Sequence, residues 1–153
     1  MYKAEKMTKE EMVKSIEHAK EMHLEQMLKI EFEIDGKIVE KRPALGKMDC
    51  ECGIWFYSHE KEMKSILGMQ FFERLDKYHE EWHRSYANIY KMFEENEKKS
   101  LFSKLLGSSE SEAMQRDKEK LYYSELQTDT QELLKAADAA IRRVSALKED
   151  KFS

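Results

Sequence analysis

The helix-breaking residues of this chain are confined almost entirely to one window. The sequence contains a single proline and five glycines. The proline and four of the glycines lie between positions 36 and 68, and the exception is Gly107. Because proline and glycine end or interrupt helices, the long segments on either side of this window are free to be helical. The sequence therefore predicts long helices separated by one irregular region.

Apolar residues at spacings of three and four predict where these helices lie. The first is expected over about residues 8–31, where Thr8 followed by Glu11 has the spacing of a capping box. A short helix over about residues 58–67 precedes a second long helix over about 69–98. The last helix carries a seam of alternating steps of three and four, formed by Tyr123, Leu126, Thr130, Leu133, Ala137, Ala140, Val144 and Leu147.

Two connections between the helices have signals of their own. Residues 30–41 alternate between apolar and polar around Asp35-Gly36, a pattern that favours a short β-hairpin, with an irregular loop as the alternative. Residues 101–107 and the serine-rich run 108–111 favour a frayed turn and a loop.

The composition agrees with a helical protein. Charged residues make up 38% of the chain and hydrophobic residues 41%, a balance typical of amphipathic helices with solvated outer faces. Such helices bury their apolar stripes most simply by packing side by side. We therefore expect an all-α antiparallel four-helix bundle with an irregular segment between its first two helices. At 153 residues, the chain is expected to form one domain over residues 1–153.

Charge and hydropathy argue against two kinds of partner. The formal net charge is −4, and the interleaved signs leave no basic stripe for nucleic-acid phosphates. No window approaches the roughly 18 apolar residues of a membrane span, and the N-terminus lacks a secretory signal. Cys50 and Cys52 are one residue apart, an awkward spacing for a disulfide that suits a reducing compartment. We expect a cytoplasmic protein without nucleic-acid binding or membrane insertion.

Three of the five histidines share a helical face with apolar residues. His23 is in line with the apolar stripe of the first helix, and His79 with that of the second long helix, with His83 one turn further on. A single inward imidazole is usually a hydrogen-bonded core residue, but it needs either such a partner or a metal ion. His18 and His59 fall outside the apolar stripes and are expected on the surface.

The cysteines offer a thiolate to complement these imidazoles. A thiolate with two or three imidazoles is a soft-to-borderline ligand set that favours zinc over magnesium or calcium. Either Cys50 or Cys52 can supply the sulfur on this reasoning.

Three parts of the sequence together resemble the chemoreceptor zinc-binding (CZB) domain family. They are His23, the run Cys50-Glu51-Cys52-Gly53-Ile54-Trp55, and the run His79-Glu80-Glu81-Trp82-His83. The family pattern is a histidine, then Cys-x-aliphatic-Gly-x-aromatic, then His-x-x-x-His. The resemblance implies a four-helix bundle that binds one Zn²⁺ through His23, Cys50, His79 and His83. Cys52 stands where the family carries an aliphatic or aromatic residue, and it is the alternative thiolate. Residues 99–120 are longer than the usual connection in the family, so the last helix is expected to begin late or to be offset.

The resemblance also implies a function. Domains of this family are regulatory inputs of bacterial chemoreceptors and of enzymes that make cyclic dinucleotides. This chain is accordingly expected to sense zinc or an oxidant and to act on a signalling partner or as a homodimer, without being an enzyme.

Two alternatives come from other classes of protein. Glu80-x-x-His83 is half of a di-iron motif of hemerythrin-like or ferritin-like bundles, although Lys20 stands three residues before His23, where a second glutamate would be needed. The other alternative is a metal-free helical interaction module.

Overall fold

The computed structural model describes residues 6–106 and 110–152, and within these ranges it contains helices and no strands. The all-α class expected from the sequence is confirmed. The elements in chain order are α1 (Lys9–Ile34), α2 (Glu51–Ser58), α3 (Glu60–Leu67), α4 (Met69–Leu106), α5 (Glu110–Ala146) and a terminal 3-10 turn, η1 (Glu149–Phe152).

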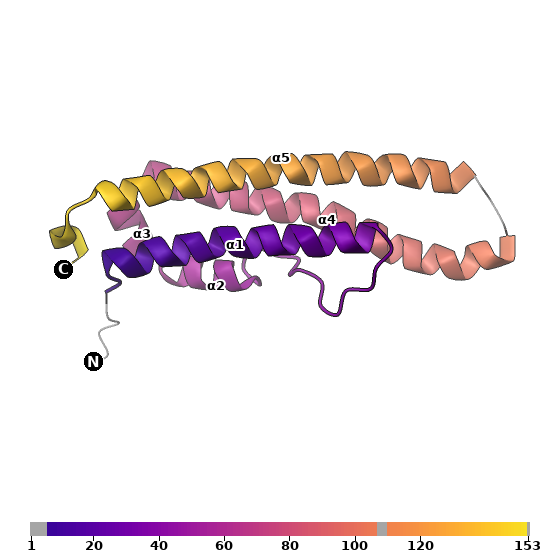
Figure 1. Ribbon diagram of the computed structural model, residues 1–153, viewed down its shortest axis with the longest axis horizontal. Helices are drawn as coiled ribbons and strands as arrows, with labels where there is room; N and C mark the ends of the chain where they lie inside the picture. Colours follow the sequence, from indigo (N-terminus) through magenta and orange to yellow (C-terminus); the bar gives the residue numbers. More distant parts are fainter. Residues whose placement is uncertain (1–5, 107–109, 153) are drawn as a thin grey trace.

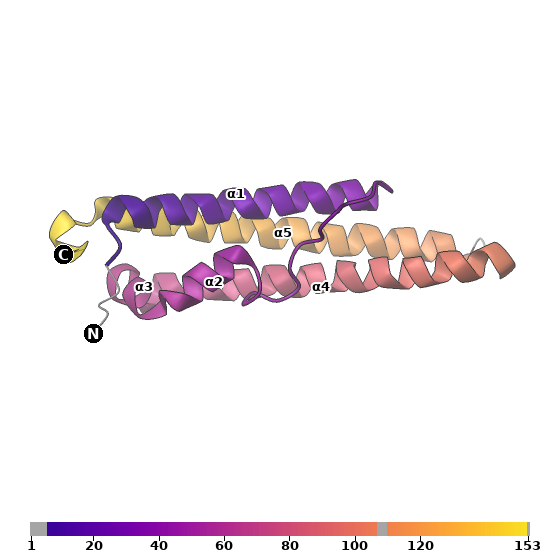
Figure 2. The same ribbon diagram turned by 90° about the horizontal axis from the view of Figure 1, so that it is seen from below.

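Three long helices lie side by side along the long axis of the molecule (Figure 1). α1 and α4 run in the same direction, and α5 runs in the opposite direction and packs against both. The short helices α2 and α3 follow one another alongside α4 (Figure 2), and α3 packs against both α4 and α5. α4 and α5 extend together beyond the end of α1 (Figure 1).

The first helix begins where the sequence predicts. Thr8 has an extended backbone, and its side chain accepts a hydrogen bond from the Glu11 amide at 3.1 Å. This bond satisfies one of the amides that have no partner at a helix N-terminus. The N-cap half of the predicted capping box is therefore confirmed.

The predicted β-hairpin over residues 30–41 is wrong. α1 continues to Ile34 and ends with Gly36 at a φ of 85°. The Lys37 amide donates to the Phe32 carbonyl at 2.9 Å, and the Gly36 amide donates to the Glu33 carbonyl at 3.0 Å. These two bonds form a Schellman motif, the common helix ending with glycine in the left-handed region. Asp35-Gly36 suited both structures because each needs a residue that adopts a positive φ.

The short helix α2 was not expected, because Gly53 lies in the window that the sequence marks as irregular. Its N-cap is Cys50, whose sulfur accepts a hydrogen bond from the Gly53 amide at 3.1 Å. Cysteine is not among the side chains that usually cap helices, so the sequence carries no recognisable start signal here.

The predicted frayed turn over residues 101–107 is also wrong for the part that the structure describes. α4 continues to Leu106, and α5 already begins at Glu110, so the last helix does not begin late. No proline interrupts this stretch, and α4 and α5 pack against each other, so the helical backbone persists beyond the end of α1. The predicted loop is partly helical as well, and residues 107–109 lie outside the described residues.

The core consists of two apolar clusters with polar residues between them. The first cluster surrounds α2 and α3 and includes Met12, Ile16, Phe56, Met63, Leu67, Phe72, Leu75, Ala140 and Val144. The second lies further along the long helices and includes Met27, Ile30, Trp82, Tyr86, Ile89, Leu126 and Leu133. His23 on α1 and His79 on α4 fall between the two clusters, and His83 lies against Trp82 of the second cluster.

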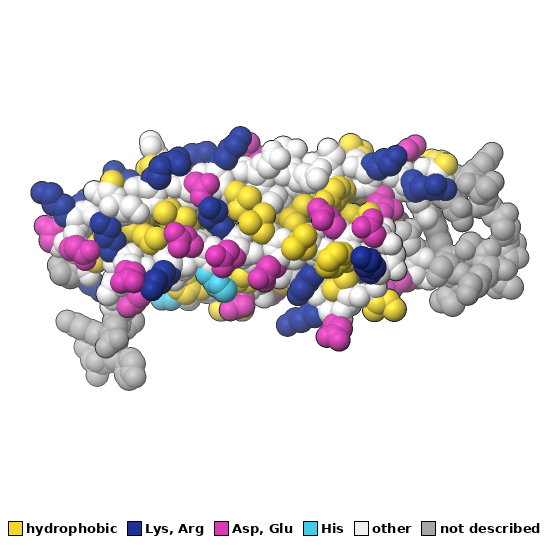
Figure 3. Space-filling model, viewed as in Figure 1, with side chains coloured by type: hydrophobic (Ala, Val, Ile, Leu, Met, Phe, Trp, Pro, Cys, Tyr) yellow, Lys and Arg dark blue, Asp and Glu magenta, His cyan; other side chains and the backbone are white. Residues whose placement is uncertain are grey.

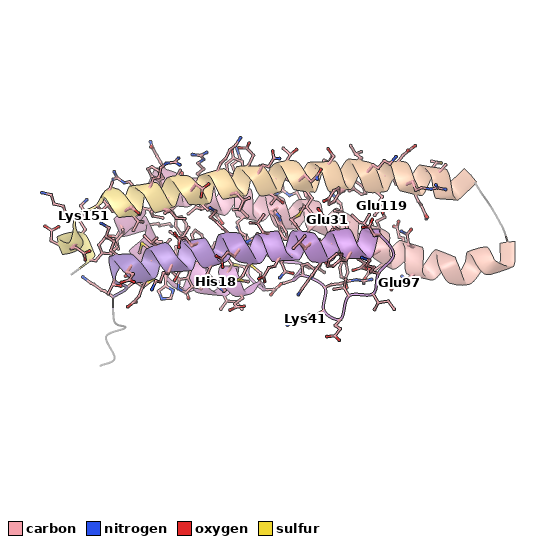
Figure 4. The ribbon with its side chains drawn as sticks, in the orientation of Figure 1. His18, Glu31, Lys41, Glu97, Glu119 and Lys151 are labelled. Atoms are coloured by element: carbon pink, nitrogen blue, oxygen red, sulfur yellow. The ribbon has the colours of Figure 1, made fainter. Side chains whose placement is uncertain are left out.

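The outer surface is strongly charged. Lysine, arginine and acidic side chains are intermixed over the face shown in Figure 3, with apolar side chains between them. Side chains that end in nitrogen or oxygen atoms project along α1 and α5 in Figure 4. In the ranges that the structure describes, no helix combines the length and the apolar run that a bilayer crossing requires.

One buried hydrogen bond links α4 to α5 in the second cluster. The indole N–H of Trp82 donates to the hydroxyl oxygen of Thr130 at 2.8 Å, and that hydroxyl donates to the Leu126 carbonyl at 2.7 Å. Trp82 is completely buried and Thr130 nearly so. Tryptophan has no second polar atom, so its buried N–H depends on this threonine.

Replacement of this threonine should therefore destabilise the protein. Thr130→Val leaves the Trp82 N–H buried without a partner, and we expect a loss of about 1–3 kcal/mol in the free energy of unfolding. Thr128→Val is the matched control, because Thr128 is exposed and also donates to a carbonyl of its own helix, that of Ser124. We expect the control to change stability by less than about 0.5 kcal/mol. Urea titrations of both variants measure the difference, and equal effects would contradict this interpretation.

Candidate metal centre

Four potential metal ligands from three separate segments meet inside the helix assembly. His23 lies on α1, Cys50 is the N-cap of α2, and His79 and His83 lie one turn apart on α4. One ligand atom from each residue lies within 4.8 Å of the corresponding atoms of the others. We call this group the His3Cys cluster. The three histidines are 4–5% exposed, and Cys50 is partly buried.

The histidines divide as the helical periodicity predicts. His23, His79 and His83 are buried, whereas His18 is exposed beside Glu51. The ring of His59 bonds to the Trp55 carbonyl at 2.8 Å and takes no part in the His3Cys cluster. The three histidines predicted to face inward are therefore buried and His18 is exposed as predicted, whereas His59, which was also predicted on the surface, is only partly exposed.

Backbone carbonyls orient two of the three buried rings. Nδ1 of His23 lies 2.8 Å from the Ala19 carbonyl, and Nδ1 of His83 lies 3.1 Å from the Ala44 carbonyl. A carbonyl oxygen can only accept a hydrogen bond, so Nδ1 carries the proton in each ring. The lone pair of each neutral imidazole is then on Nε2, the atom free to bind a metal.

The third ring completes the centre. Nε2 of His79 lies 3.1 Å from Nε2 of His83 and 3.3 Å from the sulfur of Cys50. Its Nδ1 lies 3.4 Å from the hydroxyl of Tyr57. With a proton on each Nδ1, the two Nε2 lone pairs and the sulfur face one another in a buried space. Such an arrangement is repulsive by itself and becomes favourable around a cation.

The surroundings of Cys50 favour its thiolate form. A hydrogen bond from the Cys52 thiol is the largest influence that lowers the pKa of Cys50, and the neighbouring rings of His79 and His83 lower it further, against the opposing effect of burial. The sulfur also accepts the Gly53 amide at the start of α2, where the helix dipole favours negative charge. The thiolate is the form of cysteine that binds metals.

The alternative cysteine takes a different position. Cys52 does not join the His3Cys cluster, and its hydrogen bond to Cys50, together with burial, raises the pKa of the Cys52 thiol. Its side chain lines an apolar cavity of about 40 Å³ that also touches His23 and His79. The structure therefore brings the sulfur of Cys50, rather than that of Cys52, to the three imidazoles.

Burial determines the charge of the His23 ring. It lowers the pKa of His23 to about 4, and the neighbouring His79 contributes in the same direction. His23 is therefore neutral near pH 7, which leaves its Nε2 lone pair available for a metal ion.

The sequence did not predict several polar groups that lie around the centre. Burial and a hydrogen bond to Asp76 raise the pKa of Tyr57. Burial alone would raise the pKa of Asp76, but hydrogen bonds from Tyr57 and Lys47 outweigh it and lower that pKa. In the sequence, Tyr57 is one of several aromatic residues, and Lys47 and Asp76 are ordinary charged residues, so no local pattern distinguishes them.

The residues of the half di-iron motif do not build a carboxylate site. Glu80 is half-exposed and lies 3.6 Å from Lys47, and Lys20 forms an ion pair with Asp138. In the part of the chain that the structure describes, the group suited to a metal ion contains no carboxylate. A di-iron carboxylate site needs glutamate ligands on facing helices.

Comparison with known proteins identified no relative of this chain. No protein-family model, curated protein or solved structure matches the chain. The resemblance to the chemoreceptor zinc-binding family therefore rests on the motif residues alone.

The position of the Cys50 sulfur depends on the absence of a side chain at Gly53. A Cβ at this residue would lie 1.6 Å from the Lys47 carbonyl oxygen and 3.2 Å from the Cys50 sulfur. We expect Gly53→Ala to displace the segment that carries Cys50 and to lower the affinity for Co²⁺ at least tenfold. The thiolate-to-cobalt charge-transfer absorption during a Co²⁺ titration measures both the affinity and the sulfur ligand.

Gly36→Ala is the control for this variant. No atom lies within 4 Å of a Cβ at Gly36, but its φ of 85° is unfavourable for alanine. We expect a loss of stability of about 1 kcal/mol and unchanged cobalt absorption. Cobalt spectra of Gly53→Ala that match those of the parent protein would show that the sulfur is not a ligand in this position.

Proposed function

We propose that this chain is a zinc-binding regulatory domain of the chemoreceptor zinc-binding type, a four-helix bundle in which α2 and α3 together take the place of one helix. The observation that carries the proposal is the convergence of three imidazole nitrogens and one sulfur in the His3Cys cluster. Each ring has a protein oxygen near its Nδ1, which leaves Nε2 directed to the common centre. A resident Zn²⁺ would be held by His23, Cys50, His79 and His83.

The chemistry of the donors supports zinc over other ions. Magnesium and calcium prefer oxygen ligands, which the cluster does not offer, whereas zinc binds mixed sets of imidazole and thiolate. Four protein ligands also complete the coordination that is usual for structural zinc, so no position is left for a catalytic water. This supports a regulatory rather than an enzymatic role.

The placement of the ligands supports regulation through packing. The ligands come from α1, from the start of α2 and from α4, so metal binding ties three segments together. Loss of the bond between the metal and the Cys50 sulfur would free the segment around Cys50 from the two long helices. We propose that a signalling partner, or a second copy of the chain, reads this change.

Metal content is the direct test of this proposal. Purified protein should contain one zinc per chain, measured by inductively coupled plasma mass spectrometry, because the cluster offers one set of four donors. His23→Ala or His79→Ala should remove most of the metal. His18→Ala and His59→Ala are the controls and should keep it, because neither ring reaches the centre. Two irons per chain would favour the di-iron alternative, and no metal in well-folded protein would favour a helical interaction module.

The sulfur gives the site a second way to respond. Cys50 is the oxidisable member of the ligand set, and its thiolate can react with hypochlorous acid to give a sulfenic acid and chloride. Formation of the S–O bond takes up the sulfur lone pair that would bind the metal, and the O–Cl bond breaks with its electrons leaving on chloride. The three histidines remain as ligands, so the ion can stay while the segment around Cys50 moves.

Hypochlorite treatment tests this part of the proposal. We expect one equivalent to oxidise Cys50 before Cys52 in zinc-loaded protein, because Cys50 is the thiolate. Peptide mass spectrometry identifies the modified residue, and circular dichroism follows the helical content, which should be largely retained. Cys50→Ser should lose the response. Oxidation of Cys52 first, or an unchanged response in Cys50→Ser, would make the site structural rather than redox-sensitive.

A further inference from the structure

Three polar side chains lead away from His79. The hydroxyl of Tyr57 donates to Oδ1 of Asp76 at 2.5 Å, and Nζ of Lys47 donates to the same oxygen at 2.9 Å. The Tyr57 oxygen in turn lies 3.4 Å from Nδ1 of His79. The phenol and imidazole rings are inclined by 29° to each other, with centroids 6.1 Å apart. These contacts connect a lysine of the α1–α2 loop with a ring of the His3Cys cluster.

The direction of each hydrogen bond follows from the groups involved. An ionised carboxylate only accepts hydrogen bonds, so the Tyr57 hydroxyl proton is directed to Asp76. The phenol oxygen then presents a lone pair to His79, so it can accept a hydrogen bond from the Nδ1–H group but cannot donate one to that nitrogen. His79 is thereby held in the tautomer whose Nε2 faces the Cys50 sulfur and His83.

The same contacts fix the segment that carries the sulfur. Lys47 lies three residues before Cys50, and its carbonyl oxygen is 3.5 Å from the Cys50 sulfur. Its ammonium group reaches α4, where it contacts Asp76 and, at 3.6 Å, Glu80. Asp76 lies one turn before His79 on the same helix. One lysine therefore joins the loop of the thiolate to the helix of two histidines.

We propose that Tyr57, Asp76 and Lys47 form a positioning relay, which holds His79 in its metal-binding tautomer and ties the Cys50 segment to α4. This inference rests on the proposed metal site and assigns the residues that set its affinity. None of the three touches the metal position itself. Their effect is exerted through the ring of His79 and through the loop that leads to Cys50.

A second lysine–aspartate pair provides a control for the relay. Lys20 of α1 forms an ion pair with Asp138 of α5, and it also joins two separate segments. The side chains are comparably exposed, at 27% and 45% against 25% and 34% for Lys47 and Asp76. Partly exposed pairs of this kind contribute little to stability on their own. If a variant of Asp76 weakens metal binding and a variant of Asp138 does not, the effect comes from the relay and not from the loss of an ion pair.

Metal affinity is the first measurement. We expect Tyr57→Phe and Asp76→Asn each to weaken zinc binding about 10–100-fold, as measured by competition with a chromophoric chelator. Tyr122 is a partly buried tyrosine of α5 that packs against the second cluster. Tyr122→Phe and Asp138→Asn are the matched controls and should bind zinc as the parent does. The thermal midpoint of the metal-free proteins shows whether folding is affected. Unchanged affinity in Tyr57→Phe would overturn the relay.

The order of the contacts predicts non-additive effects. Because Asp76 acts on His79 through Tyr57, the double variant should lose little more affinity than the weaker-binding single variant. Lys47→Met should also weaken binding, because it releases the loop while keeping most of the side-chain length. Full additivity of the Tyr57→Phe and Asp76→Asn effects would show that the two residues act separately.

The tautomer of His79 tests the relay without any metal. Nitrogen-15 NMR of the metal-free protein near pH 8 should show His79 protonated on Nδ1, and Tyr57→Phe should show a mixture of tautomers. Tyr122→Phe should keep the parent spectrum. If the parent protein binds no zinc but keeps this tautomer, the proposed function fails and the positioning role of Tyr57 stands. A mixture of tautomers already in the parent protein would overturn the inference.

Discussion

The burial of three imidazole rings and one sulfur at a single point is the constraint on which the rest of this structure depends. A buried polar group without a partner costs about 1–3 kcal/mol, and four such groups together would be a large fraction of the stability of a domain. Hydrogen bonds at the outer side of each ring offset part of this cost. Their acceptors are two backbone carbonyls and one phenol. The inner side of the cluster then presents electron pairs only, which is the arrangement a metal ion requires.

This constraint explains why the segment between α1 and α2 is irregular. The segment supplies the Ala44 carbonyl to His83, the Lys47 side chain to Asp76, and the sulfur of Cys50. Arg42 anchors it further by hydrogen bonds to Glu33 of α1 and Glu97 of α4. A regular helix or hairpin could not direct a carbonyl, a lysine and a sulfur to one place, because its own backbone bonds and periodicity would fix their directions.

Much of the fold could be predicted from local signals. The Thr8 cap and the apolar stripes predicted the start of α1 and the long helices, because a helical face is defined by residues three and four apart. The hairpin prediction failed because Asp35-Gly36 fits a helix ending as well as a turn, and local sequence does not distinguish them. The connection beyond residue 100 was misjudged because α4 and α5 support each other through contacts between distant parts of the chain.

The sequence by itself determined which histidines face inward, because the side on which a residue lies follows from periodicity along one helix. It also restricted the sulfur to Cys50 or Cys52. Only the tertiary structure decided between them, because the choice depends on where α2 begins and how closely Gly53 approaches Lys47. The contacts of Asp76 with Tyr57 and Lys47 join residues 19 and 29 positions apart on different elements. Such contacts depend on how the helices pack and on the path of the loop, and neither is encoded in the spacing of neighbouring residues.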